Sequence, residues 1–286
     1  MRKPIDLRGI LKYVPQYRGK TFVIALDGII TESEIFSNVL LDVAVLCSLN
    51  IRVVLVHGIG ARIAKIAKRV ANLSAEDVAA TLNLDPSLLV DGGFHPSDID
   101  GTGVTDLATL KVALIAANRC THEILEGLST ADLRAATCNG IIAHPMGIVH
   151  GVDHQLSGKV ERVDVELFQD LLQGGIIPVA PPLGFDGEGH TYRVNSDNIA
   201  CALGVQLGAQ KVIFVSDQDG LFYNNNLIGN VQAQDLHQKL LQHEEAFLPQ
   251  QISKAHHAVT ACRQGVPRVH LINGLVNESL ITEVLK

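Results

Sequence analysis

Two segments near the start of the chain share a pattern that limits the possible folds more than any other feature. In Thr21–Thr31 (TFVIALDGIIT) and in Arg52–Arg62 (RVVLVHGIGAR), an apolar run ends in a glycine turn and continues into a helix-like pattern. An apolar run of this kind is typical of a parallel strand that is buried on both faces. The glycine turn places backbone N–H groups at the carboxyl end of the strand, where phosphate-sized anions bind. The pattern therefore predicts an α/β fold with a nucleotide-type site at the strand ends.

The rest of the chain continues this alternation of strands and amphipathic helices. Strands are predicted over 22–26, 51–56, 140–143, 147–150, 176–180, 211–216 and 268–272, and residues 156–163 alternate like a hairpin arm. Helices are predicted over 7–17, 33–49, 61–70, 75–82, 106–128, 165–173, 198–207, 233–242, 252–264 and 278–285. Because helical crossovers join parallel strands, this order predicts an α/β fold whose strands pair in parallel.

The composition limits the partners that the chain can have. Its 286 residues are 47% hydrophobic, so it can bury a large core. The net charge of −7 and the lack of a basic run argue against nucleic acid as a partner. The five cysteines form no CxxC pair, which predicts buried thiols in a reducing cytoplasm rather than a metal site or disulfides. No apolar run reaches about 18 residues, so no membrane span is expected. We therefore expect a cytoplasmic protein whose partner is a small molecule.

Polar or glycine-rich residues follow four of the predicted strands. They occupy positions 27–28, 57–60, 181–197 and 217–220. Ligands of open α/β sheets bind at the carboxyl ends of the strands, so these groups are expected to lie together. A single glycine turn is a weak signal, and neither GxGxxG nor GxxxxGK[ST] is present.

Seven motifs, in this order along the chain, resemble the amino acid kinase family. They are RGKTFVI at 18–24, VHGIG at 56–60, VTDLATL at 104–110, GGIIPVAPP at 174–182, VNSDNIACAL at 194–203, VSDQDGLF at 215–222 and GVPRVHLING at 265–274. The resemblance is strongest to the acetylglutamate branch, which includes acetylglutamate kinases and the kinase-like domains of N-acetylglutamate synthases. It implies a three-layer αβα sandwich with a mainly parallel central sheet. It also implies one domain over 1–286, with an N-terminal helix over 1–17, an acyl-amino-acid half over 18–180 and an ATP half over 181–286.

The resemblance also implies roles for individual residues. Asp197 matches the carboxylate that orients the catalytic lysines, and Lys254 matches the lysine on the nucleotide side. The implied substrate-binding residues are Gly58, Gly60, Gly103 and Asn195. The implied nucleotide-binding residues are Gly28, Asp217 and Gly220, with ATP and Mg²⁺ as cofactors. No resident metal is implied.

Several departures from the family pattern lie where charge is needed. Ala25 stands where the family has a strand lysine, and Asp27 replaces the first glycine of the turn. Gly103 stands in place of the arginine that binds the substrate carboxylate, and Ala61 replaces a third glycine. A carboxylate opposes phosphoryl transfer where polyphosphate charge must be stabilised. These substitutions predict little or no kinase activity in a chain of a transferase family.

Simpler structural roles compete with these assignments. Asp197 could act only as a helix cap, and Lys254 could be a solvated surface lysine. Asp217 could bond its own turn. His57 is more typical of a packing residue than of a base.

The resemblance leaves three functions open. The first is a kinase-like domain of N-acetylglutamate synthase type in arginine biosynthesis, in which Tyr13, His270 and Glu283 fall where arginine-sensitive members contact arginine. Such members form homo-oligomers, dimers or hexamers, through the N-terminal helix, and they act with an acetyltransferase domain or partner. The alternative is an active acetylglutamate kinase that phosphorylates N-acetyl-L-glutamate with ATP. A second alternative is a non-catalytic regulatory subunit.

Overall fold

The computed structural model describes residues 14–70, 77, 80 and 103–284. Most of the predicted helices over 75–82 and 7–17 lies outside these residues, as does Tyr13. The central sheet has six strands in the order β14-β11-β1-β2-β8-β3, and every pairing in it is parallel. Its strands are β1 (Thr21–Leu26), β2 (Arg52–His57), β3 (Ala135–Ala136), β8 (Ile177–Ala180), β11 (Lys211–Ser216) and β14 (Arg268–Asn273). The predicted mainly parallel sheet is confirmed.

Strand β1 lies inside the sheet and is buried on both faces. Val23 and Ala25 belong to one core cluster, whereas Phe22, Ile24 and Leu26 belong to the cluster on the opposite face. This follows from the period of two along a strand. Each fully buried aliphatic side chain of this kind contributes about 1.5–3 kcal/mol to folding, so the apolar runs that defined the prediction also hold the sheet together.

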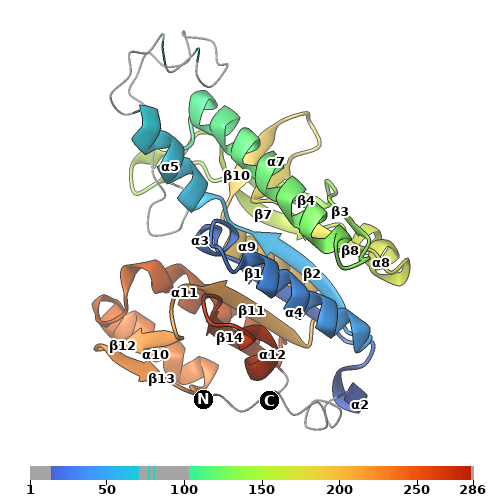
Figure 1. Ribbon diagram of the computed structural model, residues 1–286. Helices are drawn as coiled ribbons and strands as arrows, with labels where there is room; N and C mark the ends of the chain where they lie inside the picture. Colours follow the sequence, from blue (N-terminus) through green and yellow to red (C-terminus); the bar gives the residue numbers. More distant parts are fainter. Residues whose placement is uncertain (1–13, 71–76, 78–79, 81–102, 285–286) are drawn as a thin grey trace.

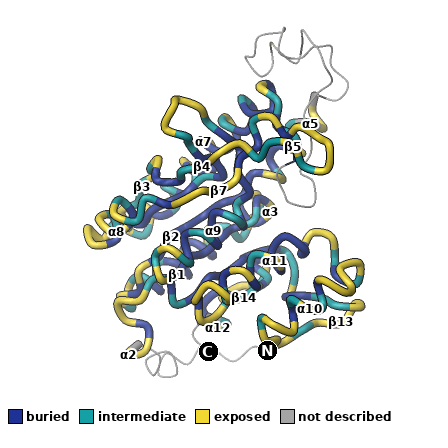
Figure 2. The backbone as a smooth tube through the Cα atoms, turned by 180° about the vertical axis from the view of Figure 1, so that it is seen from behind, coloured by how far each residue is buried: buried dark blue, intermediate teal, exposed yellow. Residues whose placement is uncertain are grey.

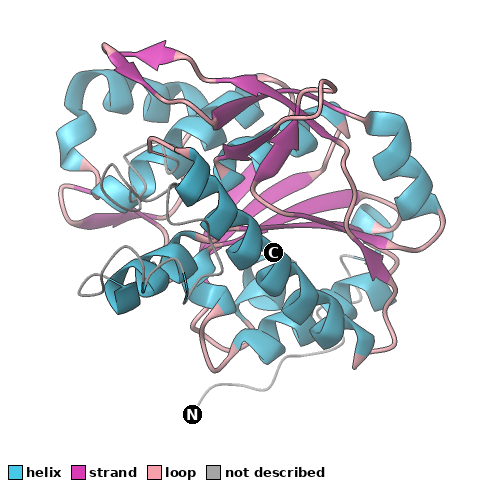
Figure 3. Cartoon of the chain, turned by 90° about the horizontal axis from the view of Figure 1, so that it is seen from above, coloured by secondary structure: helices cyan, strands magenta, loops and turns pink. Residues whose placement is uncertain are grey.

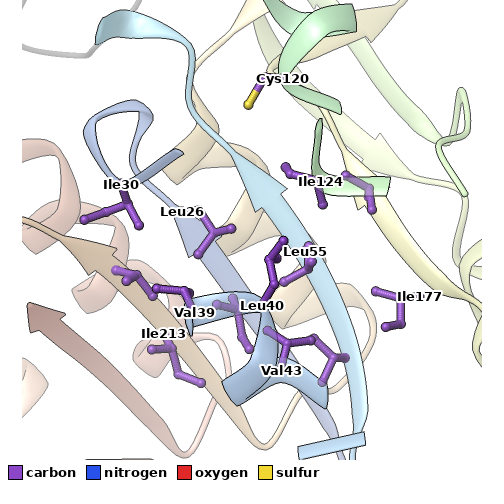
Figure 4. Close-up of a cluster of buried hydrophobic side chains, with 14 of the residues drawn as sticks. Leu26, Ile30, Val39, Leu40, Val43, Leu55, Cys120, Ile124, Ile177 and Ile213 are labelled. Atoms are coloured by element: carbon purple, nitrogen blue, oxygen red, sulfur yellow. The ribbon is translucent and has the colours of Figure 1, made fainter. Parts of the chain in front are cut away.

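Helices cover both faces of the sheet (Figures 1 and 3). One face packs against α3 (Gly28–Thr31), α4 (Phe36–Ser48), α5 (Gly60–Val70), α7 (Leu107–Ser129) and α12 (Ser279–Val284). Figure 4 shows side chains from β1, α4 and α7 gathered in this cluster. The other face packs against α8 (Val165–Gln173), α9 (Ser196–Gln206) and α11 (Pro249–Arg263), and α11 in turn packs on α10 (Ala233–His243). Short α2 (Val14–Tyr17) precedes β1, and η2 (Glu244–Ala246) precedes α11.

Four strands form a closed barrel beside the sheet that the sequence did not predict. They are β4 (Ile141–Pro145), β7 (Ser157–Val163), β9 (Leu183–Phe185) and β10 (Thr191–Val194). Two small hairpins are added by β5 (Ile148–Val149) with β6 (Val152–Asp153), and by β12 (Leu221–Tyr223) with β13 (Asn226–Ile228). Strands β9 and β10 lie in the predicted polar stretch 181–197, and β12 and β13 lie where no strand was predicted. Each has only three or four residues, which is too short to produce a periodic pattern.

Burial follows this architecture (Figure 2). The backbone through β1, β2 and α9 is mostly buried, whereas β13 is largely exposed. Among the described residues, no helix is both long and apolar enough to span a membrane.

Candidate functional site

The carboxyl ends of the central strands lie together, as the sequence predicted. The backbone N–H of Asp27 donates to the carbonyl of Val215 over 2.9 Å, and that of Gly58 donates to the carbonyl of Leu26 over 2.8 Å. The N–H of Gly274 donates to the carbonyl of Ser216 over 2.7 Å. These bonds tie the turns after β1, β2 and β14 to neighbouring strands, so residues from distant segments meet at one edge of the sheet.

The first two glycine turns touch each other. A Cβ at Gly58 would lie 3.1 Å from the backbone nitrogen of Gly28, and a Cβ at Gly28 would lie 3.2 Å from that of Ala61. Both are backbone contacts that a side chain could not relieve by rotating. Gly60 begins α5. The structure explains the glycines by this close approach, and their ligand-binding roles stay predictions.

A buried lysine lies between two carboxylates at the strand ends. Nζ of Lys254, on α11, is 2.9 Å from Oδ1 of Asp27 and 3.4 Å from Oδ2 of Asp197, which lies in the first turn of α9. The exposed fractions of the three side chains are 10% for Lys254, 25% for Asp27 and 7% for Asp197. Lys254 is therefore not a solvated surface lysine, and that simpler interpretation is wrong.

Two neutral side chains complete this strand-end cluster, which we define as Asp27, Asn195, Asp197, Ser253 and Lys254. Oγ of Ser253 donates to Oδ2 of Asp197 over 2.9 Å, and Nδ2 of Asn195 donates to Oγ of Ser253 over 3.1 Å. Oδ1 of Asn195 accepts from the N–H of Asp197 over 2.7 Å and so caps α9. The cap is Asn195, so the interpretation of Asp197 as only a cap is wrong. Sequence reasoning missed Ser253, although it directly precedes Lys254.

One ammonium shared by two carboxylates sets the electrostatics of the cluster. Burial raises the pKa of Asp27 to about 6; Lys254 opposes this rise, and the carboxylates of Asp197 and Asp217 add to it. Burial alone would lower the pKa of Lys254, but Asp197 and Asp27 together hold it above its ordinary value. With all three groups ionised, the net charge is −1. Lys254 is therefore a firmly protonated cation whose charge is already balanced inside the protein.

Strand β1 supplies no cation to this site. Ala25 is 3% exposed, belongs to an apolar core cluster, and pairs in register with Val56 and Phe214. Gly103 supplies no guanidinium either. Gly103 has a φ of +61°, and its carbonyl oxygen accepts from Oγ of Ser157 over 2.5 Å. Positions 25 and 103 thus contribute only a methyl group and a backbone carbonyl.

The turn after β11 is bonded by the side chain of Ser216. The N–H of Gln218 donates to Oγ of Ser216 over 3.2 Å, whereas Oδ1 of Asp217 accepts from the side-chain amide of Gln218 over 3.1 Å. The backbone turn is therefore bonded by Ser216, and the simpler interpretation in which Asp217 bonds its own turn is wrong. The nucleotide-binding role of Asp217 stays a prediction. Gly220 has a φ of +141°, and its carbonyl accepts from Nε2 of Gln251 over 2.6 Å.

His57 ends β2 inside the core. Its Nε2 lies 2.8 Å from Oγ1 of Thr121, and burial lowers its pKa to about 4. His57 is neutral at physiological pH, and its burial agrees with a packing role.

A second group of ionisable side chains, which we call the edge cluster, lies at β14. We define it as Lys211, Arg268, His270 and Glu283. Burial lowers the pKa of His270 to about 4, with a further lowering by Lys211 and an opposing effect of Glu283. Burial also lowers the pKa of Lys211 to about 8, and its Nζ lies 4.6 Å from the ring centroid of Tyr17. Sequence reasoning missed Lys211, because a lysine at the start of an apolar strand gives no sign of being buried.

The edge cluster borders a large groove. Arg268, His270 and Glu283 line a cavity of about 2190 Å³ that continues along α10 and the turn at Gly220. Nε2 of His270 is buried and has no hydrogen-bond partner among the described residues. Tyr13, the third residue predicted to contact arginine, lies outside the described residues.

One group of side chains has the composition of a metal site. Ligand atoms of Asp186, Glu188 and His190 lie within 4.8 Å of one another in the loop between β9 and β10. The carboxylate of Asp186 already accepts from the backbone N–H groups of Glu188 and His190 and from Tyr192. These bonds explain the arrangement without an ion.

Comparison with known proteins agrees with the resemblance seen in the motifs. The sequence signature described as "Amino acid kinase family" matches residues 20–273. An amino-acid acetyltransferase of Shewanella oneidensis is 32% identical over 286 residues, which cover 95% of this chain and 59% of the relative. One from Yersinia pseudotuberculosis is 30% identical and is covered to 60%. The chain thus spans about three fifths of the length of these relatives.

Solved structures show the same fold. The N-acetylglutamate synthase from Neisseria gonorrhoeae, complexed with coenzyme A and N-acetyl-glutamate, has a TM-score of 0.79 and 25% identity, with 98% of this chain and 60% of that chain covered. The same enzyme complexed with coenzyme A and L-arginine gives a TM-score of 0.79 with 23% identity and covers 98% of this chain and 62% of that chain. Carbamate kinase from Giardia lamblia, at 11% identity and a TM-score of 0.62, covers 92% of this chain and 95% of that one and shares the fold alone.

Proposed function

The chain belongs to the amino acid kinase family, and on this basis we propose that it is a kinase-like domain of N-acetylglutamate synthase type that binds an amino acid and transfers no phosphoryl group. The named relatives and the Neisseria structures support the synthase type and a place in arginine biosynthesis. Their acetyltransferase activity belongs to longer chains. We therefore propose that acetyl transfer requires an acetyltransferase domain or partner, and that the domain works in the cytoplasm as a homo-oligomer.

The absence of phosphoryl transfer rests on the strand-end cluster. Phosphoryl transfer is catalysed mainly by positioning and by positive charge, and loss of one stabilising group costs about 10²–10³ in rate. In this chain β1 contributes Ala25 instead of a cation. The remaining lysine, Lys254, is bound by Asp27 and Asp197. An incoming γ-phosphate would meet a net negative charge.

The amino-acid ligand is assigned to the edge cluster. Glu283 carries a carboxylate that suits the guanidinium or the α-ammonium group of arginine. His270 lines the large groove and has a buried nitrogen without a hydrogen-bond partner among the described residues. Lys211 and Arg268 add positive charge that suits an α-carboxylate. The structural neighbour with bound L-arginine supports this choice of ligand. We propose that His270, Glu283 and Tyr13 bind L-arginine.

One observation favours the alternative function. Asn195, Asp197 and Lys254 are all present and lie within one hydrogen-bonded network, which is the arrangement that an active acetylglutamate kinase would need. In that case Mg²⁺ and ATP would have to displace Asp27 from Lys254. The two functions differ in whether ATP binds at the strand ends.

Calorimetric titration with L-arginine, N-acetyl-L-glutamate and MgATP tests the proposal. We expect heat of binding with L-arginine and none with MgATP. Glu283→Gln should weaken arginine binding, whereas Glu161→Gln, which removes an exposed charge on β7, should leave it unchanged. Tight MgATP binding by the wild-type protein, or an arginine affinity that is indifferent to Glu283→Gln, would contradict the proposal.

A further inference from the structure

The three charged side chains at the strand ends differ in their solvent exposure, and this difference suggests a role for Asp27. Asp27 is the most exposed of the three at 25%, Lys254 is 10% exposed, and Asp197 is 7% exposed. The carboxylate of Asp27 is therefore the group of this triad that solvent reaches most easily. A dissolved anion that approached Lys254 would meet the negative charge of Asp27.

Asp27 occupies a helix N-cap position, but its carboxylate contacts Lys254 instead of the helix backbone. Asp27 precedes α3 in extended geometry, with φ −61° and ψ 148°, which is an N-cap position. Aspartate at such a position usually accepts a hydrogen bond from a backbone N–H of the first turn. Asp27 makes no such side-chain cap bond. Its carboxylate instead contacts Nζ of Lys254 at 2.9 Å.

We propose that Asp27 determines the specificity of the strand ends by acting as an internal anion: its carboxylate holds Lys254 in place of a phosphate or other oxyanion and so excludes such anions. The inference rests on the proposed function, because it names the residue that keeps phosphate groups away from the strand ends. It concerns a single side chain of this sequence, which stands where the family pattern has glycine.

The surroundings of Asp27 would otherwise suit an oxyanion. Gly28 follows Asp27 directly, and Gly58, the first glycine of the second turn, lies against it. The 11-residue helix α5 begins at Gly60, beside these turns. Backbone N–H groups and a helix N-terminus favour negative charge, and an ammonium group that has three donors can hold both Asp197 and a bound anion. Without the charge of Asp27, Lys254 and Asp197 together would be neutral and one side of the ammonium would be open.

Sulfate is a suitable probe, because its charge stays constant from pH 5 to pH 8. We would titrate sulfate into wild-type protein, Asp27→Asn and Asp27→Gly at constant ionic strength and follow binding by calorimetry. Asp27→Gly should bind sulfate at least about tenfold more tightly than wild type at pH 7.5, since a like charge next to the bound anion is removed. Asp27→Asn should gain less, because its amide oxygen can still accept from Lys254.

Asp219→Asn is the matched control for a general change in charge. Asp219 is exposed in the turn after β11 and bonds Nδ2 of Asn273. Its substitution removes one negative charge on the same side of the sheet and leaves Asp27 and Lys254 in contact. Sulfate affinity in Asp219→Asn should stay at the wild-type level.

A pH series on the wild-type protein tests the inference without any substitution. Asp27 has a pKa of about 6, so between pH 7.5 and pH 5 it takes up a proton and sulfate affinity should rise about tenfold. The charged groups that face Asp27 are Lys254 from α11, Asp197 from α9 and Asp217 after β11. His57 at the end of β2 stays neutral over this range, because its pKa is about 4. In Asp27→Asn the rise should be absent.

These measurements distinguish a failure of the role inferred for Asp27 from a failure of the proposed function. Equal sulfate binding in wild type, Asp27→Asn and Asp27→Gly, an equal gain in Asp219→Asn, or a wild-type affinity that is flat with pH would each overturn the role of Asp27. None of these results affects arginine binding at the edge cluster. Conversely, if L-arginine does not bind at the edge cluster, the proposed ligand is wrong, but the expected effect of Asp27 on sulfate binding is unaffected.

Discussion

The strand-end cluster and the edge cluster contain similar side chains in opposite situations. At the strand ends, Lys254 lies between Asp27 and Asp197, and burial is compensated by charges within the protein. At the β14 edge, the buried ammonium of Lys211 lies over the ring of Tyr17, and its pKa falls to about 8. The pKa of Lys254 is instead raised. The comparison teaches that the partners of a buried lysine, rather than its presence in a motif, decide the direction in which its pKa shifts.

The two regions also differ in how completely their polar atoms are bonded. Asn195, Asp197 and Ser253 bond one another within the protein. His270 presents a buried nitrogen with no hydrogen-bond partner among the described residues, beside a groove of about 2190 Å³. A ligand at the edge can bond this nitrogen of His270, whereas a ligand at the strand ends must break existing bonds.

The largest expected effect comes from removing the cation of the strand-end cluster. Lys254→Met leaves the buried carboxylate of Asp197 and the half-buried carboxylate of Asp27 without their shared ammonium, which should lower the free energy of unfolding by about 3–5 kcal/mol at pH 7.5. Urea denaturation measures this. Lys65→Met is the control, because Lys65 is 59% exposed and its surface ion pair with Glu32 should contribute less than about 1 kcal/mol. A loss below 1 kcal/mol for Lys254→Met would break the comparison.

The edge cluster should respond in binding rather than in stability. Glu283→Gln removes a charged partner of the ligand, and L-arginine should bind about tenfold to a hundredfold more weakly, the equivalent of about 1.5–3 kcal/mol. Thermal unfolding without arginine should change little. If the substitution unfolds the protein and leaves arginine affinity unaltered in the folded fraction, Glu283 is structural and the contrast between the two regions disappears.

Ser253→Ala should sharpen the distinction between bonded and open sites. It removes the hydroxyl that joins Asn195 to Asp197, and a buried polar group left without its partner costs about 1–3 kcal/mol. Chemical denaturation of Ser253→Ala would be compared with that of Ser129→Ala, whose exposed hydroxyl bonds only the carbonyl of Glu126 within its own helix. Equal small losses in both variants would show that the network contributes little.

The smallest effect is a pH dependence. The folded pKa of Asp27 is about 6, above the ordinary value of 3.8, so the folded state binds more protons than the unfolded state between these values. Its ionisation therefore reduces stability as pH rises through this window. Asp42, with a pKa of about 6, acts in the same direction, whereas the lowered pKa values of His57 and His270 act in the opposite one.

The variant Asp27→Asn separates the contribution of Asp27 to the pH dependence from the contributions of the other groups. The difference in unfolding free energy between wild type and Asp27→Asn should shift by about 1–2 kcal/mol between pH 4.5 and pH 7.5, with the wild type relatively more stable at pH 4.5. Denaturation curves at the two pH values supply the number. A constant difference would mean that Asp27 titrates normally.

Much of the central sheet was predictable from local sequence. The apolar runs of β1, β2 and β11 predict strands that are buried on both faces, and the structure agrees with them. The barrel strands β9 and β10 were missed, because three or four residues carry no periodic signal. The contact between Asp27 and Lys254 joins a turn near the start of the chain to a helix near its end. Sequence reasoning recognised both residues separately, but only the fold shows that they neutralise each other.

The most direct test of the central claim is an ATP-dependent hydroxamate assay of the wild-type protein with N-acetyl-L-glutamate and Mg²⁺. Because Ala25 supplies no cation and Asp27 holds Lys254, we predict no acyl hydroxamate above the background without protein. Sustained hydroxamate formation that depends on both ATP and N-acetyl-L-glutamate, and that is lost in Lys254→Met protein shown to be folded, would contradict the account.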